Sequence, residues 1–174
     1  IARKAMSFIR ERDTIYLDSG TTTCELAKLL CDYHKPVSVV TNDLNVAMIL
    51  SDSDVDLTIV GGNVQKKTRS IFGHASEQFL KQFRFSKAFL GGSSVGDQFD
   101  LFSPTYDKAY LKRFILELAN QSYLLVDSSK FYRQSMCLIE NISRFSAVIT
   151  DKKFDQKEME RITELNIHMI SVSK

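Results

Sequence analysis

The segment Asp18-Ser19-Gly20-Thr21-Thr22-Thr23 has the residue types of an anion-binding loop. It follows a short apolar run and precedes the pattern of a helix that begins near Thr22. The first backbone N–H groups of a helix have no partner within the helix, and the helix dipole adds partial positive charge there. Gly20 lets the backbone approach a ligand, and the Ser and Thr hydroxyls add donors. The segment therefore predicts a phosphate cradle, with a simple helix cap as the alternative.

Lys130 is a candidate partner for the same anion, because it follows an apolar run that ends in Asp127. Its ammonium group can reach a phosphate as a point charge, and a solvated surface lysine is the alternative. The basic run Lys66, Lys67 and Arg69 is typical of a solvated loop, with the rim of an anionic site as the alternative. The chain has neither a GxxxxGK[ST] loop nor a GxGxxG fingerprint. ATP, GTP and NAD are therefore not expected ligands.

Two further patterns bear on catalysis and metal binding. The string Gly92-Ser93-Ser94-Val95-Gly96 matches the GxSxG motif of hydrolases, but no amphipathic helix pattern follows it, as that motif requires. The cysteines form no CxxC pair, and the three scattered histidines complete no zinc-ligand spacing. We therefore expect no catalytic serine, no metal, no cofactor, and free thiols in a reducing cytoplasm. The cysteines are Cys24, Cys31 and Cys137.

Alternating apolar patterns indicate the elements that position these residues. Runs that are apolar on both faces predict strands buried in a parallel sheet. Amphipathic segments between them predict helices, so the chain is expected to form an α/β fold. Its sheet should be doubly wound and mostly parallel, with helices on both faces. The predicted strands are Thr14–Asp18, Val37–Thr41, Val55–Val60, Lys87–Leu90, Tyr123–Asp127, Ala147–Asp151 and Ile167–Ser171. The predicted helices are Ala2–Glu11, Thr23–Tyr33, Leu44–Ser51, Ala75–Phe83, Asp107–Asn120 and Asp155–Leu165.

Small and polar residues follow six of the predicted strands. In an open parallel sheet, ligands bind beyond the carboxyl ends of the strands. Turns between strands and helices use such residues in any case, but six endings at one edge also predict a pocket for a small polar ligand. The segment Gly91–Tyr106 has no period and is either a long functional loop or a small irregular insertion. The six endings are Asp18–Thr23, Thr41-Asn42, Gly61–Asn63, Gly91–Ser94, Asp127–Lys130 and Thr150-Asp151.

Length and charge limit the remaining possibilities. A chain of 174 residues is the size of one domain, so we expect residues 1–174 to fold together. The formal net charge of +2 is too balanced for a dedicated nucleic-acid surface. No apolar run approaches the length of a transmembrane helix. The chain opens within an amphipathic pattern and without Met, which we interpret as a piece of a longer protein.

These motifs, in this order and over nearly all of the chain, resemble the effector-binding domain of DeoR-type transcriptional repressors of bacterial sugar metabolism. The specific motifs are the strings from Thr14 to Thr23 and from Asp127 to Phe131. The supporting matches are Val39-Val40-Thr41-Asn42, Ile59-Val60-Gly61-Gly62, Gly73, Lys87-Ala88-Phe89-Leu90-Gly91 and Val148-Ile149-Thr150-Asp151.

The resemblance implies the fold of the ribose-phosphate isomerase and CoA-transferase group. It also implies a winged helix-turn-helix domain before Ile1, which would contact operator DNA, and a homodimer or homotetramer without a membrane partner. The effector should be a phosphorylated sugar, often one taken up by a phosphotransferase system. Ser19 to Thr23 and Lys130 would hold the phosphate. The residues that would face the sugar are Asp18, Thr41, Asn42, Gly61, Gly62, Asp107 and Asp127.

The sequence departs from the family pattern at the start of the helix after the long loop. Family members often carry acidic residues there, whereas this chain has Tyr106-Asp107-Lys108-Ala109-Tyr110. Asp107 can fill that role, but Tyr110 cannot supply a carboxylate.

Two functions remain open from the sequence. One is a ligand-sensing domain of a repressor, in which effector binding shifts the equilibrium between two arrangements of the subunits. The other is a sugar-phosphate isomerase or deaminase, which needs a general base at the substrate carbon. The candidate bases are Asp18, Asp107, Asp127 and Asp151, with no Glu or His at a strand end. The resemblance favours the sensor over the enzyme.

Overall fold

A computed structural model describes residues 1–173 and places a seven-stranded sheet at the centre of the molecule. Every pair of neighbouring strands in this sheet is parallel, as the doubly apolar runs predict. The order across the sheet is β12 (Met169–Ser171), β11 (Ala147–Thr150), β9 (Ala119–Leu125), β6 (Phe85–Gly91), β1 (Thr14–Leu17), β2 (Ser38–Thr41) and β3 (Asp56–Ile59).

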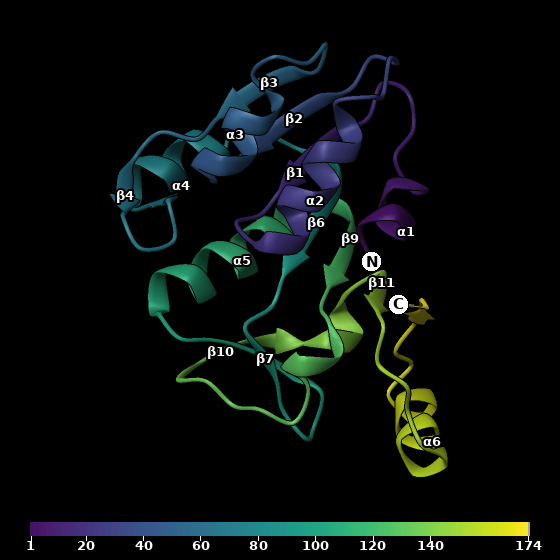
Figure 1. The fold of residues 1–174 in the computed structure, drawn as a ribbon. Coiled ribbons are helices and arrows are strands. Elements are labelled where there is room, and N and C mark those ends of the chain that lie inside the picture. Colours follow the sequence, from purple (N-terminus) through teal and green to yellow (C-terminus); the bar gives the residue numbers. More distant parts are fainter. Residues whose placement is uncertain (174) are drawn as a thin grey trace.

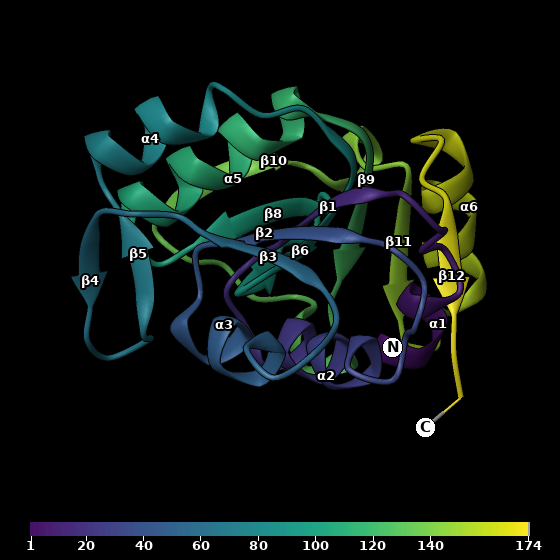
Figure 2. The ribbon, with the colours of Figure 1, turned by 90° about the horizontal axis from the view of Figure 1, so that it is seen from above.

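Helices cover both faces of this sheet, which confirms the predicted layers (Figures 1 and 2). The helices are α1 (Ala2–Met6), α2 (Thr21–Leu30), α3 (Leu44–Leu50), α4 (His74–Leu80), α5 (Tyr106–Leu118) and α6 (Gln156–Glu164). In Figure 2, α1 to α3 lie below the sheet, and α4 and α5 lie above it. The first helix is shorter than predicted: its last residue is Met6, and the hydroxyl of the C-cap residue Ser7 donates to the carbonyl of Lys4 at 2.7 Å.

Alternating side chains of each strand feed two separate hydrophobic clusters. In β1, Ile15 and Leu17 pack with α1 to α3, whereas Tyr16 packs with the helices of the opposite face. The same alternation places Phe89 of β6 in the first cluster and Ala88 and Leu90 in the second. All six side chains are 0% exposed. Burial on both faces explains why these strands are apolar without strict alternation of polar residues.

The segment after β6 is a small structured insertion rather than an irregular loop. It contributes β7 (Ser94–Val95) and β8 (Asp100–Ser103) to a three-stranded antiparallel sheet with β10 (Cys137–Asn141). A second unpredicted element is the hairpin of β4 (Asn63–Gln65) and β5 (Ser70–Phe72). The strands of both additions mix polar and apolar residues, as in Asn63–Gln65 and Asp100–Ser103, so no continuous apolar run marks them in the sequence.

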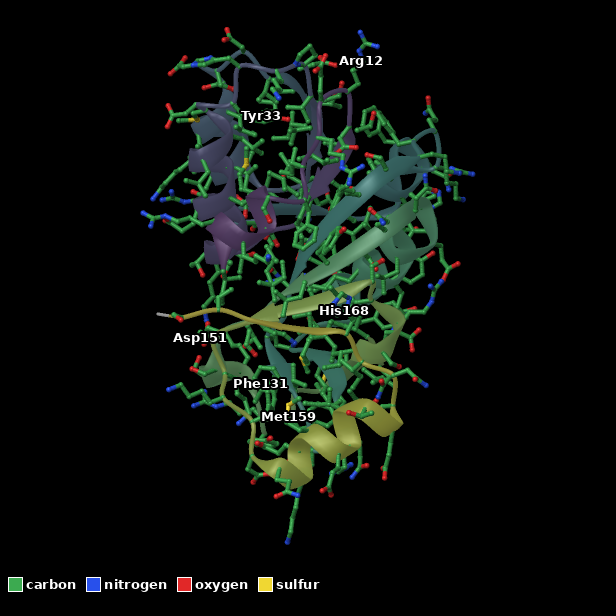
Figure 3. All side chains as sticks on the ribbon, turned by 90° about the vertical axis from the view of Figure 1, so that its right-hand side faces the viewer. Arg12, Tyr33, Phe131, Asp151, Met159 and His168 are labelled. Carbon is green, nitrogen blue, oxygen red and sulfur yellow. The ribbon has the colours of Figure 1, made fainter. Side chains whose placement is uncertain are left out.

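Two 3-10 helices complete the chain, and the first carries Lys130. They are η1 (Ser128–Lys130) and η2 (Ile142–Arg144). The carboxylate of Asp151 accepts from the Ser128 N–H at 2.7 Å. The Lys152 ammonium lies over the Tyr132 ring, 4.7 Å from its centroid, and pairs with Glu158 at 3.2 Å. These contacts fasten the Lys130 segment to the connection between β11 and α6, where Figure 3 shows Asp151 between the strands and α6.

Two features of residues 1–173 bear on the function classes. No helix within them has the length and the apolar character that crossing a membrane demands. They also contain no group of three or more His, Cys, Asp or Glu side chains arranged to hold a metal ion.

Candidate functional site

A cavity of about 530 Å³ lies at the carboxyl edge of the sheet, beside the point where the strand order reverses. From β1 the chain moves outward to β2 and β3, and it later continues in the opposite direction from β6 to β9. Loops on the two sides of such a reversal diverge and leave a crevice. The cavity is lined by Ser19, Gly20, Thr21, Thr22, Thr23, Cys24, Glu25, Asp43, Asn45, Thr68, Gly91, Gly92, Ser93, Lys108, Lys112, Leu125, Val126, Asp127 and Lys130.

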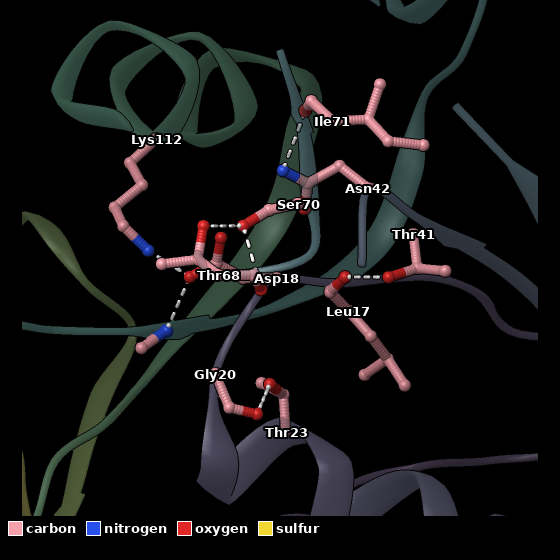
Figure 4. Close-up of polar contacts among 11 residues, drawn as sticks. Leu17, Asp18, Gly20, Thr23, Thr41, Asn42, Thr68, Ser70, Ile71 and Lys112 are labelled. Carbon is pink, nitrogen blue, oxygen red and sulfur yellow. Dashed lines mark hydrogen bonds and ion pairs between the residues drawn. The ribbon is translucent and has the colours of Figure 1, made fainter. Parts of the chain in front are cut away.

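The first turn of α2 forms one wall of this cavity. The first hydrogen bond of the helix runs from the Cys24 N–H to the Gly20 carbonyl at 3.0 Å. The N–H groups of Thr21, Thr22 and Thr23 precede that bond and therefore have no acceptor within the helix. The Thr23 hydroxyl donates to the Gly20 carbonyl at 2.8 Å, so it serves the backbone (Figure 4). The backbone donors are thus the groups that this turn offers to an anion.

A buried ion pair crosses the crevice beneath the cavity. The Asp18 carboxylate accepts from the Lys112 ammonium of α5 and from the Gly91 N–H, the latter at 2.9 Å (Figure 4). The side chains of Lys112 and Asp18 are 7% and 3% exposed. Asp18 thus joins the end of β1 to the end of β6 and to α5. Its position at the floor of the site is structural, and it presents the cavity with a lysine that is already neutralised.

Two other lysines line the cavity from different sides. Lys108 lies one helical turn before Lys112 on α5, and Lys130 ends η1. Within residues 1–173, neither ammonium group forms an ion pair or a hydrogen bond. Burial lowers the pKa of Lys108, and the nearby charge of Lys112 lowers it further. Both lysines are half-buried.

The acidic and thiol groups of the cavity are bound to local partners or held neutral. Asp43 caps α3, where its carboxylate accepts from the N–H groups of Asn45 at 2.7 Å and Val46 at 3.2 Å, and burial raises its pKa. Asp127 caps η1 by accepting from the Ser129 N–H at 2.8 Å. Burial raises the pKa of the Cys24 thiol to about 11, so the thiol stays protonated. None of these groups is arranged as a nucleophile with its base.

The structure brings together all six residues that the sequence assigns to a phosphate. Ser19, Gly20, Thr21, Thr22, Thr23 and Lys130 all line the cavity. Of the seven residues assigned to the sugar, only Asp127 lines it. Asp18 lies beneath it in the ion pair described above.

Four of the other sugar-facing assignments fall on residues outside the cavity, and the side chains of two of them are bound to the backbone. The Thr41 hydroxyl donates to the Leu17 carbonyl at 2.7 Å, and the Asn42 amide donates to the Ile71 carbonyl at 3.1 Å (Figure 4). Gly61 and Gly62 lie at the start of the β4–β5 hairpin, outside the cavity.

Gly62 has a local reason for its identity. Its φ is +148°, and a Cβ atom at this position would lie 2.8 Å from the carbonyl oxygen of Phe72, so no side chain fits there. Asp107, the last sugar-facing assignment, is exposed on α5 and does not line the cavity.

Sequence reasoning missed Lys108 and Lys112, together with Asp43, Asn45 and Thr68. The two lysines are four residues apart on a predicted helix, so they share one face of it. That spacing is a usable signal. Thr68 belongs to the unpredicted hairpin, whose tip carries the basic run. There Arg69 donates to the Asn45 side chain at 3.1 Å, which makes the hairpin a rim of the cavity.

Comparison with known proteins identifies the family to which this chain belongs. Residues 1–152 match the family model described as the DeoR C terminal sensor domain. The chain belongs to the DeoR family. A sensor domain of this family is also what the motifs at Thr14–Thr23 and Asp127–Phe131 predict.

Curated relatives of this DeoR sensor domain are transcriptional regulators. An uncharacterized HTH-type regulator of Haemophilus influenzae is 33% identical over 99% of this chain and 67% of its own length. The glycerol-3-phosphate regulon repressor of Escherichia coli is 33% identical over 97% of this chain and 67% of its own length. The lactose phosphotransferase system repressor of Streptococcus mutans is 32% identical over 95% of this chain and 66% of its own length. The chain thus spans about two thirds of the length of these relatives.

Solved structures place the DeoR sensor domain in the predicted fold group. Ribose 5-phosphate isomerase A of Methanocaldococcus jannaschii aligns with a TM-score of 0.53 at 18% identity, over 75% of this chain and 51% of the enzyme. The eIF2B delta subunit of Chaetomium thermophilum aligns with a TM-score of 0.64 at 17% identity, over 88% of this chain and 54% of the subunit. At such identities the likeness concerns the fold alone.

Proposed function

We propose that this chain is the effector-binding domain of a cytoplasmic repressor of sugar uptake or catabolism, and that it binds a phosphorylated sugar at the carboxyl edge of its sheet. The observation that carries the proposal is the cavity wall formed by three unpaired N–H groups of α2, which faces a site that also contains Lys130. A volume of about 530 Å³ is within the usual range for small-molecule sites.

The phosphate would bind at the first turn of α2. The N–H groups of Thr21 to Thr23 and the hydroxyls of Ser19, Thr21 and Thr22 supply donors there. Hydrogen bonds to a charged group contribute about 1.5–3 kcal/mol each. Lys130 adds a cation from the opposite loop, whose position is fixed by the hydrogen bond between Ser128 and Asp151.

The sugar hydroxyls would contact the polar groups that line the rest of the cavity. Asp43 and Asp127 would accept from sugar hydroxyls with carboxylates that also cap α3 and η1. Asn45 and Ser93 offer further polar groups. This set replaces Thr41, Asn42, Gly61, Gly62 and Asp107, which lie outside the cavity.

A regulatory role fits the relatives, each of which is named as a transcriptional regulator or repressor. In the complete protein, a DNA-binding domain upstream of Ile1 would contact the operator, and the protein would act as a homodimer or homotetramer. Effector binding would favour one of two subunit arrangements. A modest rotation suffices, because operator recognition by a helix-turn-helix dimer depends on the spacing of its two half-sites.

The cavity supports sensing better than catalysis. Isomerisation needs a carboxylate free to take a proton from carbon, whereas Asp18 is held by Lys112 and Asp43 and Asp127 cap helices. The Ser94 hydroxyl of the GxSxG string is buried and bonds to Ser135 at 2.7 Å. The isomerase-like fold keeps a sugar-phosphate isomerase as the second candidate, and a turnover assay with ribose 5-phosphate tests it.

A thermal-shift screen tests the proposal. The panel contains sugar phosphates, the matching unphosphorylated sugars and inorganic phosphate. A ligand at 100 times its Kd adds about 2.7 kcal/mol, which corresponds to roughly 5–10 °C in a domain of this size. We expect a shift with a sugar phosphate, and its loss in Thr21→Ala or Lys130→Ala. Lys153→Ala is the matched control, because Lys153 is exposed and outside the cavity. If no phosphorylated compound raises the Tm, the cradle is only a helix start.

A further inference from the structure

The half-buried Lys108 has no anionic partner on its side of the cavity. It lies on α5 next to the β4–β5 hairpin, and its surroundings include Lys112, Lys67, Asp18 and Asp43. The Asp18 carboxylate is paired with Lys112, and an Asp43 carboxylate oxygen accepts hydrogen bonds from two N–H groups of α3. No ion pair reaches the Lys108 ammonium from any of residues 1–173.

Partial burial of an unpaired ammonium group is unfavourable unless an anion compensates it. The pKa of Lys108 is lowered first by burial and then by the charge of Lys112, which is consistent with a positive charge that lacks an anionic partner. The exposed Lys66 and Lys67 and the Arg69 guanidinium at the hairpin tip add positive charge on this side. This end of the cavity is therefore suited to an anion.

Lys108 and Lys130 enter the cavity from different elements. Lys130 ends η1 and interacts with Asp127, whereas the charges that act on Lys108 come from α5, the hairpin and the ends of β1 and β2. Two unpaired cations thus line one cavity from different elements, which is one more than a phosphate held by α2 and Lys130 uses.

We propose that the effector carries a second anionic group, a carboxylate or a second phosphate, which Lys108 binds at the hairpin end of the cavity. This inference rests on the proposed function, because it assumes that the first phosphate occupies the start of α2. The class of ligand is then a sugar bisphosphate or a phosphorylated sugar acid. Lys108 acts as a specificity-determining residue, and Lys130 serves every phosphorylated ligand.

Calorimetric titration with matched ligand pairs tests the inference on the unmodified domain. Fructose 1,6-bisphosphate is compared with fructose 6-phosphate, and 6-phosphogluconate with glucose 6-phosphate. The first pair adds a phosphate and the second adds a carboxylate, so the two pairs distinguish the sources of the charge. We expect the doubly anionic member of at least one pair to bind about tenfold more tightly or better, as one added charged hydrogen bond provides.

The variant Lys108→Gln assigns that preference to a residue. It should remove the tenfold advantage and change the Kd of the monophosphates less than about threefold. Lys108→Arg should keep the preference, Lys130→Gln should weaken both members of each pair, and Lys157→Gln on exposed α6 is the control.

The outcomes separate the two proposals. If monophosphates bind as tightly as the doubly anionic ligands, the second-anion inference is wrong and the proposed function stands. An advantage that persists in Lys108→Gln overturns the assignment to Lys108. If none of the four compounds binds and inorganic phosphate does not bind either, both proposals fall. Because the comparison within each pair needs only the unmodified domain, a variant that misfolds does not decide the result.

Discussion

The buried pair of Asp18 and Lys112 should dominate the stability of the site. In Lys112→Met the Asp18 carboxylate, which is 3% exposed, keeps only the Gly91 N–H as a donor. Breaking a buried pair by removing one partner costs about 3–5 kcal/mol, because it leaves an uncompensated charge. For a domain of this size, each kcal/mol lowers the Tm by about 2–4 °C. We therefore expect the Tm to fall by roughly 6–20 °C.

A double-mutant cycle isolates the pair from other effects of the substitution. Asp18→Asn keeps the shape and an oxygen that accepts from Gly91, but leaves the ammonium of Lys112 buried without a partner. The double variant removes both charges, so it should be less destabilised than the sum of the two single variants by about 2 kcal/mol. Urea unfolding followed by circular dichroism measures all four proteins at one pH.

Lys108→Met is the matched control for this cycle. It removes the same group one helical turn away, where no carboxylate pairs with it, so it should not lower the free energy of unfolding by more than about 0.5 kcal/mol. Equal destabilisation by Lys112→Met and Lys108→Met would refute the reasoning, as would strict additivity of Asp18→Asn and Lys112→Met.

Three further predictions concern the rest of the fold. Gly62→Ala should lower the free energy of unfolding by about 2 kcal/mol or more because of its φ of +148° and the nearby Phe72 carbonyl. Gly61→Ala, where a methyl group meets nothing within 4 Å, should change the same quantity little in urea titrations. Burial raises the pKa of Asp13, but hydrogen bonds from Lys87 and other donors outweigh it and hold this pKa below its usual range. The stability from this carboxylate is therefore complete above about pH 4 and is lost as the pH falls through the folded-state pKa. Asp13→Asn should flatten the Tm profile between about pH 5 and pH 3, and an unchanged slope would contradict the assignment. Lys152→Met should lower the Tm by a few degrees, since about 1 kcal/mol of cation–π and ion-pair energy is lost, and a fall equal to that in the exposed Lys153→Met would argue against it.

The sequence predicts the large sheet well because burial on both faces leaves a strong local signal. Runs such as Val37–Thr41 and Ala147–Asp151 are apolar throughout most of their length, and their strands lie within them. The largest difference is at β9, which begins at Ala119, four residues before the predicted Tyr123 and within the end of the predicted helix Asp107–Asn120. The insertion after Gly91 and the hairpin before Gly73 carry no such signal. Their strands are held by pairing with other short segments, as Leu138 of β10 pairs with Phe102 of β8. Contacts of that kind are not visible in local periodicity.

Some residues of the candidate site could likewise be predicted from the sequence, and others could not. The cradle at Ser19 to Thr23 is predictable because the loop and the helix start are adjacent in the chain. Thr41 and Asn42 also follow a strand, yet their side chains turn to the backbone of Leu17 and Ile71, which only the packed structure reveals. Polar residues at a strand end therefore identify the edge where ligands bind, but they do not separate ligand contacts from structural ones.

The most direct test of the account is an NMR titration of the isotopically labelled domain with inorganic phosphate and then with a sugar phosphate that shifts its Tm. The account predicts that the backbone amide resonances of Thr21, Thr22 and Thr23 move first and most, and that the Lys130 segment follows. Shifts that gather around Arg3 and Lys4 and leave Thr23 and the Lys130 segment unchanged would contradict it. Arg3 and Lys4 line a second cavity of about 820 Å³, which shares Thr21 and Thr22 with the first, so Thr23 and Lys130 distinguish the two.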